Sequence, residues 1–396
     1  MIHNVRHLSR QPAPGYLPRG ENWFHEIPFL PHGWETTNDH GSGTLKHAAM
    51  KALLKDQSQL KPELFEIVPW HLAKYLWESL GKCNKQTLYM WKLMATMYPA
   101  EFPQTSPYYC LGTGSPREPL KAYMGMLNNK DFRWRAVLTL ASTYCSLTDL
   151  SGIPNIKNLV ALEICLSRGN RSQMDQENVT KEQVSLQDGS VRGWVEMWQF
   201  TRALQHLRVL RIYHQHGLTT AALRSLCELP GLQLVVAYAC DKITQEISSH
   251  RKPSNNILPI EGWSASRLDW LPKEKALTDL GPLLDVYKAS LGTDPDADGQ
   301  QKQPSTLVTN LPILEFQLPT ANHNNPERVA QRAMYRPRSI VFFTRDPAMQ
   351  KLDQEKKQRE RGKKRSEPVE GPNPRARKAV MKDRGRDIST TLNAFF

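Results

Sequence analysis

The chain has 396 residues, and its 52 Lys and Arg residues outnumber its 39 Asp and Glu residues to give a formal net charge of +13. Hydrophobic residues make up 39% of the sequence and include ten tryptophans. This is enough for one large or two ordinary domains, and it excludes disorder over the whole chain. The mean hydropathy is −0.55, and no apolar run reaches about 18 residues, so we expect no membrane-spanning helix.

Two features predict an intracellular protein. The first ten residues contain two His and two Arg but no apolar core of the length found in signal peptides. The six cysteines are scattered and form no C-x-x-C pair, which is typical of reduced structural thiols rather than of a disulfide framework or a zinc site. We therefore expect a reducing compartment.

In chain order, residues 1–43 predict an irregular arm, rich in Pro, His and Gly with interspersed aromatic residues. Because exposed aromatic side chains are costly in water, we expect this arm to pack on the domain that follows. From Thr44 to Tyr98 the apolar residues recur with the period of helices, and a further short helix is predicted at 120–127. Residues 44–128 are therefore predicted to form a helical domain.

The sequence VPWHLAKYLW begins at Val68 and is followed by Leu88 and Trp91. It resembles the F-box, a helical motif that opens with Leu-Pro, continues with spaced leucines and ends in a Trp-containing helix. Val68 replaces the first Leu of that family, and Trp70 replaces the acidic residue after Pro. The resemblance implies a contact with the adaptor of a cullin ubiquitin ligase, and two buried packing helices are the alternative interpretation. The residues implied in the contact are Pro69, Leu72, Leu76 and Trp91.

A spacing of apolar residues at i, i+3, i+6 and i+8 recurs through the middle of the chain. A partial copy begins at Phe132 and a late copy begins at Val308. The full copies are Ile156, Leu159, Leu162 and Ile164; Leu204, Leu207, Leu210 and Ile212; and Leu226, Leu229, Leu232 and Leu234. The pattern resembles the leucine-rich repeat family, in which each repeat ends in a short strand that stacks on the next.

This resemblance implies an α/β fold in which an irregular leucine-rich-repeat solenoid, at residues 129–346, follows the helical domain. Polar insertions are predicted at 167–193 and 292–306. A helix is predicted at 273–291, and two strands at 312–318 and 339–344, enclosing a helix at 326–334, are expected to close the array. The Asn that follows the strand in that family is replaced here by Thr143, Ser167, Gln215 and Ala237.

The concave face of such a solenoid is a platform for a protein partner. Because Leu210 and Ile212 point inward, Arg211 and Tyr213 are expected on the opposite side of their strand, facing the concave surface. Arg and Tyr are common anchors in protein interfaces, so these two residues are candidates for partner binding. A solvated strand face is the alternative.

Motifs that carry chemistry were incomplete wherever they occurred. The glycine-rich segments at 41–43 and 112–114 are too short to cradle a phosphate. The calcium-loop-like tract at 294–299 has Ser305 where a bidentate carboxylate is needed, and the pair formed by His214 and His216 has no third metal ligand. We therefore expect no metal, no cofactor and no enzymatic activity, with dispersed catalytic residues as the alternative.

Residues 347–396 form a basic tail that is predicted to be disordered. From Lys351 onward it carries 14 Lys and Arg against 7 Asp and Glu, which is +7 of the net charge. Its basic clusters suit nuclear import or non-specific contact with nucleic acid.

The last eight residues resemble the PIP box, the peptide Gln-x-x-aliphatic-x-x-aromatic-aromatic that binds DNA sliding clamps. Leu392, Phe395 and Phe396 would form one apolar plug on a single helical turn. Ser389 replaces the family's Gln and removes its amide hydrogen bonds. The resemblance implies a sliding clamp as partner, while another partner and docking onto the chain itself are the alternatives.

Taken together, the sequence predicts a non-enzymatic, nuclear protein-interaction adaptor that acts by tethering. The solenoid would hold one protein, and the terminal peptide would bind a clamp. The alternative hypothesis is an F-box-like substrate receptor of a cullin ubiquitin ligase.

Overall fold

The computed structural model describes part of the chain, and every structural statement below concerns that part. The described residues are 6–7, 23, 25–30, 44–113, 116–141, 145–165, 185–248, 262–271, 278–291, 310–318 and 339–345. The chain divides into two units, Met1–Pro347 and Ala348–Phe396, and the second unit lies outside the described residues.

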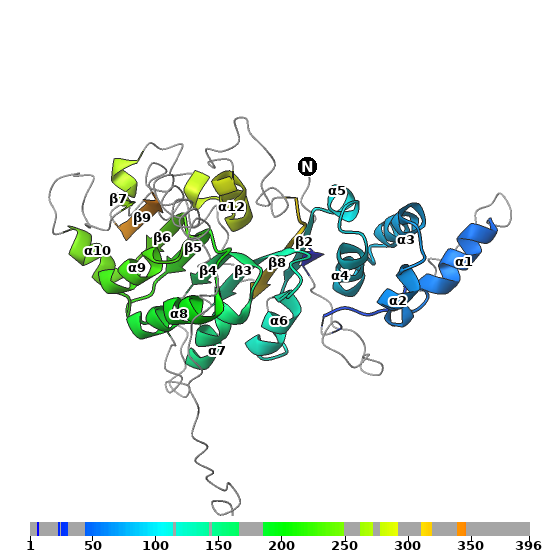
Figure 1. The fold of residues 1–396 in the computed structure, drawn as a ribbon, viewed down its shortest axis with the longest axis horizontal. Coiled ribbons are helices and arrows are strands. Elements are labelled where there is room, and N and C mark those ends of the chain that lie inside the picture. Colours follow the sequence, from blue (N-terminus) through cyan, green and yellow to red (C-terminus); the bar gives the residue numbers. More distant parts are fainter. Residues whose placement is uncertain are drawn as a thin grey trace, which may run out of the picture. The chain divides into compact units, whose positions relative to one another are not determined.

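The first unit begins with a group of helices (Figure 1). Hydroxyl caps start two of them: the Thr44 side chain accepts a hydrogen bond from the His47 amide, and the Thr87 side chain accepts one from the Met90 amide. The helices are α1 (Leu45–Leu54), α2 (Pro62–Phe65), α3 (Trp70–Lys82), α4 (Leu88–Met97) and α5 (Phe102–Thr105), with a 3-10 turn, η2, at Gln57–Gln59.

The N-terminal arm packs on these helices where it is described, as predicted. Trp23 is buried, and its ring lies 5.3 Å from that of Tyr89. The buried carboxylate of Glu26 accepts hydrogen bonds from the Leu88 amide and the Tyr109 hydroxyl, both at 2.6 Å. Because an anion is favourable at the start of a helix, Glu26 both fixes the arm and stabilises the first turn of α4.

A nine-stranded sheet follows, in the order β1-β2-β8-β3-β4-β5-β6-β9-β7. Neighbours from β1 to β6 are parallel, whereas β9 is antiparallel to both β6 and β7. The predicted α/β class is therefore confirmed. The strands are β1 (Arg6–His7), β2 (Tyr108–Gly112), β3 (Arg135–Ala141), β4 (Leu159–Cys165), β5 (Val209–Tyr213), β6 (Leu234–Tyr238), β7 (Trp263–Arg267), β8 (Ile313–Leu318) and β9 (Ile340–Arg345).

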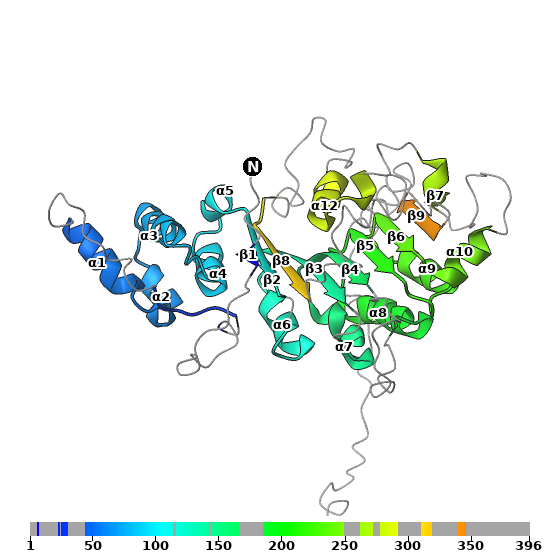
Figure 2. The ribbon, with the colours of Figure 1, turned by 180° about the vertical axis from the view of Figure 1, so that it is seen from behind.

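Helices cover both faces of the sheet (Figures 1 and 2). One face carries α6 (Leu120–Leu127), α7 (Leu147–Gly152), α8 (Asp188–Thr201), α9 (Thr220–Cys227) and α10 (Asp241–Ser248). The other face carries α12 (Leu283–Leu291), which packs on β4 and β5. The remaining 3-10 turns are η4 (Ile153–Asn155) and η5 (Leu268–Trp270).

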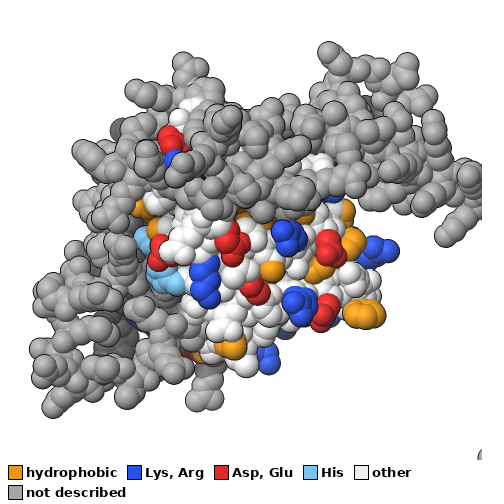
Figure 3. Space-filling model, turned by 90° about the vertical axis from the view of Figure 1, so that its left-hand side faces the viewer, with side chains coloured by type: hydrophobic (Ala, Val, Ile, Leu, Met, Phe, Trp, Pro, Cys, Tyr) orange, Lys and Arg blue, Asp and Glu red, His pale blue; other side chains and the backbone are white. Residues whose placement is uncertain are grey.

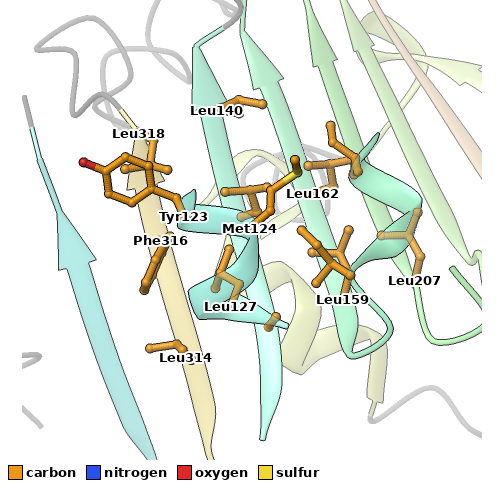
Figure 4. Packing of buried hydrophobic residues seen from close by; sticks show 14 of the residues in the cluster. Tyr123, Met124, Leu127, Leu140, Leu159, Leu162, Leu207, Leu314, Phe316 and Leu318 are labelled. Carbon is orange, nitrogen blue, oxygen red and sulfur yellow. The ribbon is translucent and has the colours of Figure 1, made fainter. Parts of the chain in front are cut away.

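The larger hydrophobic core lies under α6 to α10 and continues into the N-terminal helices. Figure 4 shows Tyr123, Met124 and Leu127 of α6 against leucines of the strands and Phe316 of β8. A smaller core joins the opposite face of the sheet to α12. Every position of β3 to β6 is buried, because helices close both faces of these strands.

The recurring leucine pattern agrees with the strand register in three successive copies. Leu138, Leu162 and Leu210, which occupy the i+6 position, pair side by side across β3, β4 and β5. In the next copy the prediction is wrong by three residues, because Leu210 pairs with Val235 and not with Leu232. Leu234 consequently faces α12 and belongs to the smaller core.

The late copy is also displaced from its predicted place. Both late strands exist, as predicted, but β8 lies between β2 and β3 in the interior of the sheet. Only β9 covers an edge, that of β6, by antiparallel pairing. The expectation that both strands close the end of the array is therefore wrong. The helix predicted at 326–334 lies outside the described residues.

Several predicted boundaries differ from the elements observed. Residues 108–112 lie within the predicted helical domain but form β2, and α6 packs on the sheet. Asp188 to Gly193, predicted as part of a polar insertion, belong to α8. The helix predicted at 273–291 corresponds to α12, which begins at Leu283.

Candidate functional site

The sheet face proposed to bind a partner is closed. Arg211 and Tyr213 point to the side opposite α9, as the strand alternation predicts, but they are only 1% and 2% exposed. Tyr213 packs in the smaller core together with Leu284 and Tyr287 of α12. Their predicted role as accessible anchors is therefore wrong in this arrangement, because α12 occupies the surface that a partner would need.

Arg211 instead ties α12 to the sheet. Its Nη1 lies 3.2 Å from Oε2 of Glu163 on β4, and its Nη2 donates hydrogen bonds to the carbonyl oxygens of Asp279, at 3.0 Å, and Gly281, at 2.6 Å. Burial raises the pKa of Glu163, whereas the guanidinium of Arg211 opposes that rise. The buried ion pair thus fixes the segment that leads into α12, which is a structural task.

Further polar side chains continue across the same face. Glu315 of β8 is buried and accepts hydrogen bonds from the Tyr108 hydroxyl and from Nε2 of Gln317, the latter at 3.0 Å. Burial raises the pKa of Tyr108, and the nearby Glu315 adds to the effect. Arg135 donates from Nη1 to the Tyr287 hydroxyl at 3.1 Å. These groups satisfy one another, as buried polar groups must.

Two of the four residues implied by the F-box resemblance lie in the core. Trp91 is fully buried, with ring centroids of Phe102 and Trp134 each 6.0 Å away. Leu76 is 7% exposed and belongs to the same core. The prediction that either side chain contacts an adaptor directly is therefore wrong, because both are buried. The alternative interpretation, two buried packing helices, explains the burial of both residues.

The other two residues lie on the surface, beside further apolar side chains. Leu64, Ile67 and Leu72 are 52%, 89% and 36% exposed, and Pro69 is also exposed. We call these four residues the α2–α3 patch. Val68 and Trp70, which alternate with the patch residues in sequence, pack on the core. The side chains of the patch therefore point outward. Four exposed apolar residues within nine positions form the kind of cluster that marks interaction surfaces.

Two buried side chains that follow the strands bond the backbone, a role that the sequence pattern predicted for neither of them. Gln215, two residues after β5, is fully buried; its Oε1 accepts from the Leu186 amide at 2.7 Å, and its Nε2 donates to the Tyr213 carbonyl at 3.0 Å. Cys240, two residues after β6, points its thiol at the carbonyl oxygens of Ile212 and Tyr238, both at 3.6 Å. With the register corrected, Cys240 occupies the last position of the pattern L-x-x-L-x-L-x-x-N/C, and Gln215 stands at the same position after β5, where the pattern has Asn or Cys.

The two histidines considered for metal binding have separate surroundings. His216 Nδ1 lies 2.9 Å from an Asp241 carboxylate oxygen on the surface, and the His214 ring contacts Tyr238. The part of the chain that the structure describes contains no group of three or more His, Cys, Asp or Glu residues placed to hold a metal ion. All six cysteines are unpaired, and burial raises the pKa of the Cys240 thiol to about 12.

Ser389, Leu392, Phe395 and Phe396, the residues of the PIP-box-like peptide, lie outside the described residues, as does the basic tail. In the described ranges, no helix is both long enough and apolar enough to cross a membrane. Figure 3 shows the end of the sheet at which α9 and α10 lie, where acidic and basic side chains are interspersed and hydrophobic ones are scattered.

Comparisons with protein-family models, with curated proteins and with solved structures find no match to this chain.

Proposed function

We propose that this chain is a non-enzymatic protein-interaction adaptor that binds a partner through the α2–α3 patch. The observation that carries the proposal is the contrast between two surfaces. The sheet face is sealed by α12, with Arg211 only 1% exposed, whereas Ile67 of the patch is 89% exposed. Apolar side chains that are exposed to water favour binding, because a partner that covers them removes their apolar surface from water.

The finer description of the sheet as an irregular leucine-rich solenoid is also part of the proposal. It is supported by the sequential order of β3, β4, β5 and β6 and by the helices that follow the strands on one face. The side chains of Gln215 and Cys240 add to this support, because they bond the backbone at the position that the family gives to Asn or Cys. In this proposal α12 is an insertion that fills the concave face.

The α2–α3 patch also favours the second candidate function, an F-box-like substrate receptor of a cullin ubiquitin ligase. Pro69 and Leu72 are exposed at the start of α3, where the resemblance requires an adaptor contact. In this version the core residues Leu76 and Trp91 support the helices and do not contact the adaptor.

Affinity purification of the full chain from a nuclear extract tests these proposals. If the chain is an F-box-like receptor, we expect the double variant Ile67→Asp, Leu72→Asp to lose binding of a cullin adaptor. If it is an adaptor of another kind, we expect the same variant to lose a different specific partner. Leu147→Asp is the matched control, because Leu147 is 47% exposed on α7, away from the patch in sequence. Recovery of the same proteins by the double variant and by the control would reject the patch as a binding surface.

The clamp-binding peptide, nuclear localisation and nucleic-acid contact by the tail remain part of the adaptor proposal and are supported by the sequence. Replacing Phe395 and Phe396 by Ala is expected to abolish recovery of the sliding clamp while leaving proteins bound through the α2–α3 patch in place. Unchanged recovery of the clamp would reject the tail assignment alone.

A further inference from the structure

Helix α1 has two apolar faces, only one of which packs on the protein. Met50 and Leu54 are buried in the core shared with α3. At 100° per residue a second set of apolar side chains lies on the opposite side, and all of its members are exposed. We call this set the outer face of α1, and it consists of Leu45, Ala48, Ala49, Ala52 and Leu53.

The two leucines of the outer face are large and strongly exposed, Leu45 at 86% and Leu53 at 50%. The alanines lie between them along the helix. Leucine anchors with small residues between them suit another helix, because the small side chains let two helix axes approach to about 8–10 Å. A face of this size, with two leucines and three alanines, offers little apolar volume for insertion into a membrane interface.

Lysines lie along both borders of the outer face. In the helical projection, Lys46 lies next to Leu53 at one border of this face. Lys55 lies next to Ala48 at the other border. The Lys46 ammonium is 4.4 Å from the centre of the Tyr75 ring, which holds it at its border. The sequence of α1 contains no carboxylate, so this face presents an apolar strip between positive charges.

The first carboxylate after the helix does not neutralise these lysines. Oδ1 of Asp56 accepts hydrogen bonds from the Ser58 amide at 2.9 Å and from its hydroxyl at 2.6 Å, where it caps η2. A second copy of α1 is also a poor occupant, because its outer face has the same lysine borders and its helix contains no carboxylate to pair with them. Like charges at the borders of a helix pair disfavour that pairing.

We propose that the outer face of α1 binds an amphipathic helix of a partner protein whose apolar strip is bordered by Asp or Glu. This inference deepens the adaptor function proposed above and depends on it: α1 provides a docking surface in addition to the α2–α3 patch and the terminal peptide. The leucines supply the buried contact, and the lysines select an acidic partner and orient it.

Fluorescence anisotropy with two synthetic helical peptides tests the inference on the full chain. Both peptides carry the same Leu and Ala strip, and their border positions are all Glu in one and all Lys in the other. We expect the Glu peptide to bind at least about tenfold more tightly than the Lys peptide, and its binding to weaken as salt is raised. Equal binding of the two peptides, or no binding of either, would overturn the proposal.

Two variants locate the site. The double variant Leu45→Asp, Leu53→Asp should lose binding of the Glu peptide by about tenfold or more, while Leu147→Asp should bind as the wild type does. Lys46→Glu with Lys55→Glu keeps the leucines and should reverse the preference in favour of the Lys peptide. If the charge reversal leaves the preference unchanged, the lysines do not select the partner and the inference is wrong.

Anionic phospholipid vesicles provide the competing outcome. Cosedimentation that requires Leu45 and Leu53, without binding of the Glu peptide, would replace the partner helix with a membrane surface. The α2–α3 patch is intact in all of these variants. Failure here therefore leaves the proposed function standing, whereas failure of the Ile67 and Leu72 variants would reject the patch without affecting peptide binding to α1.

Discussion

Replacing Arg211 by Met removes the group that fastens α12 to the sheet. The variant leaves Glu163 buried without its cation and deprives the carbonyl oxygens of Asp279 and Gly281 of donors at 3.0 and 2.6 Å. Breaking a buried ion pair from one side costs about 3–5 kcal/mol. Against a total stability of roughly 5–15 kcal/mol for a domain, we expect a large loss, of about 4 kcal/mol.

The loss should depend on pH in a defined direction. Burial raises the pKa of Glu163, and Arg211 opposes that rise, so the Arg211→Met variant should have a still higher pKa at this carboxyl. A folded-state pKa above the unfolded value means that the folded protein binds the additional proton, so stability falls as pH increases through that window. The deficit of the variant should therefore be smallest near pH 5 and largest near pH 8.

Urea denaturation of the full chain at both pH values measures these effects. The double variant Arg211→Met, Glu163→Gln contains no buried charge at this place and should recover part of the loss, with a deficit that no longer changes with pH. The reasoning would be refuted if the single variant lost less than about 1 kcal/mol. A deficit that is the same at pH 5 and pH 8 would refute the role assigned to Glu163.

Three further variants test the packing, and two of them are compared with a control variant. Trp91→Ala should cost about 3–5 kcal/mol in urea denaturation, whereas Leu72→Asp should cost less than about 0.5 kcal/mol; a similar loss in both would contradict their different burial. Gln215→Leu should cost about 1–3 kcal/mol, because it leaves the buried Leu186 amide without its acceptor. A neutral effect would contradict a stabilising role for this hydrogen bond. An added Cβ at Gly231 would lie 2.5 Å from the Gln205 carbonyl oxygen, so Gly231→Ala should lower the melting temperature by several degrees, while Gly189→Ala, with open space at its Cβ, should not.

The repeat spacing was informative because it follows backbone geometry. Side chains two residues apart in a strand share a face, so Leu162 and Ile164 mark an inward-facing strand wherever it lies. The same rule placed Arg211 on the opposite face correctly. The spacing did not determine the register of β6. Two alignments satisfy the pattern there, because Leu232, Leu234, Val235 and Ala237 are all apolar.

Spacing in the sequence determined the α/β class, the N-terminal helices and the order of the central parallel strands, and the aromatic residues of the arm predicted the burial of Trp23. Only the tertiary structure decided which of those surfaces are open. A strand or helix pattern shows which side chains share a face, but it carries no information about a distant segment that covers it. Thus α12, which begins 70 residues after Tyr213, buries Arg211 and Tyr213. Ile67 and Leu72 share the helical periodicity of Leu76, but they are exposed because nothing in the described chain covers them.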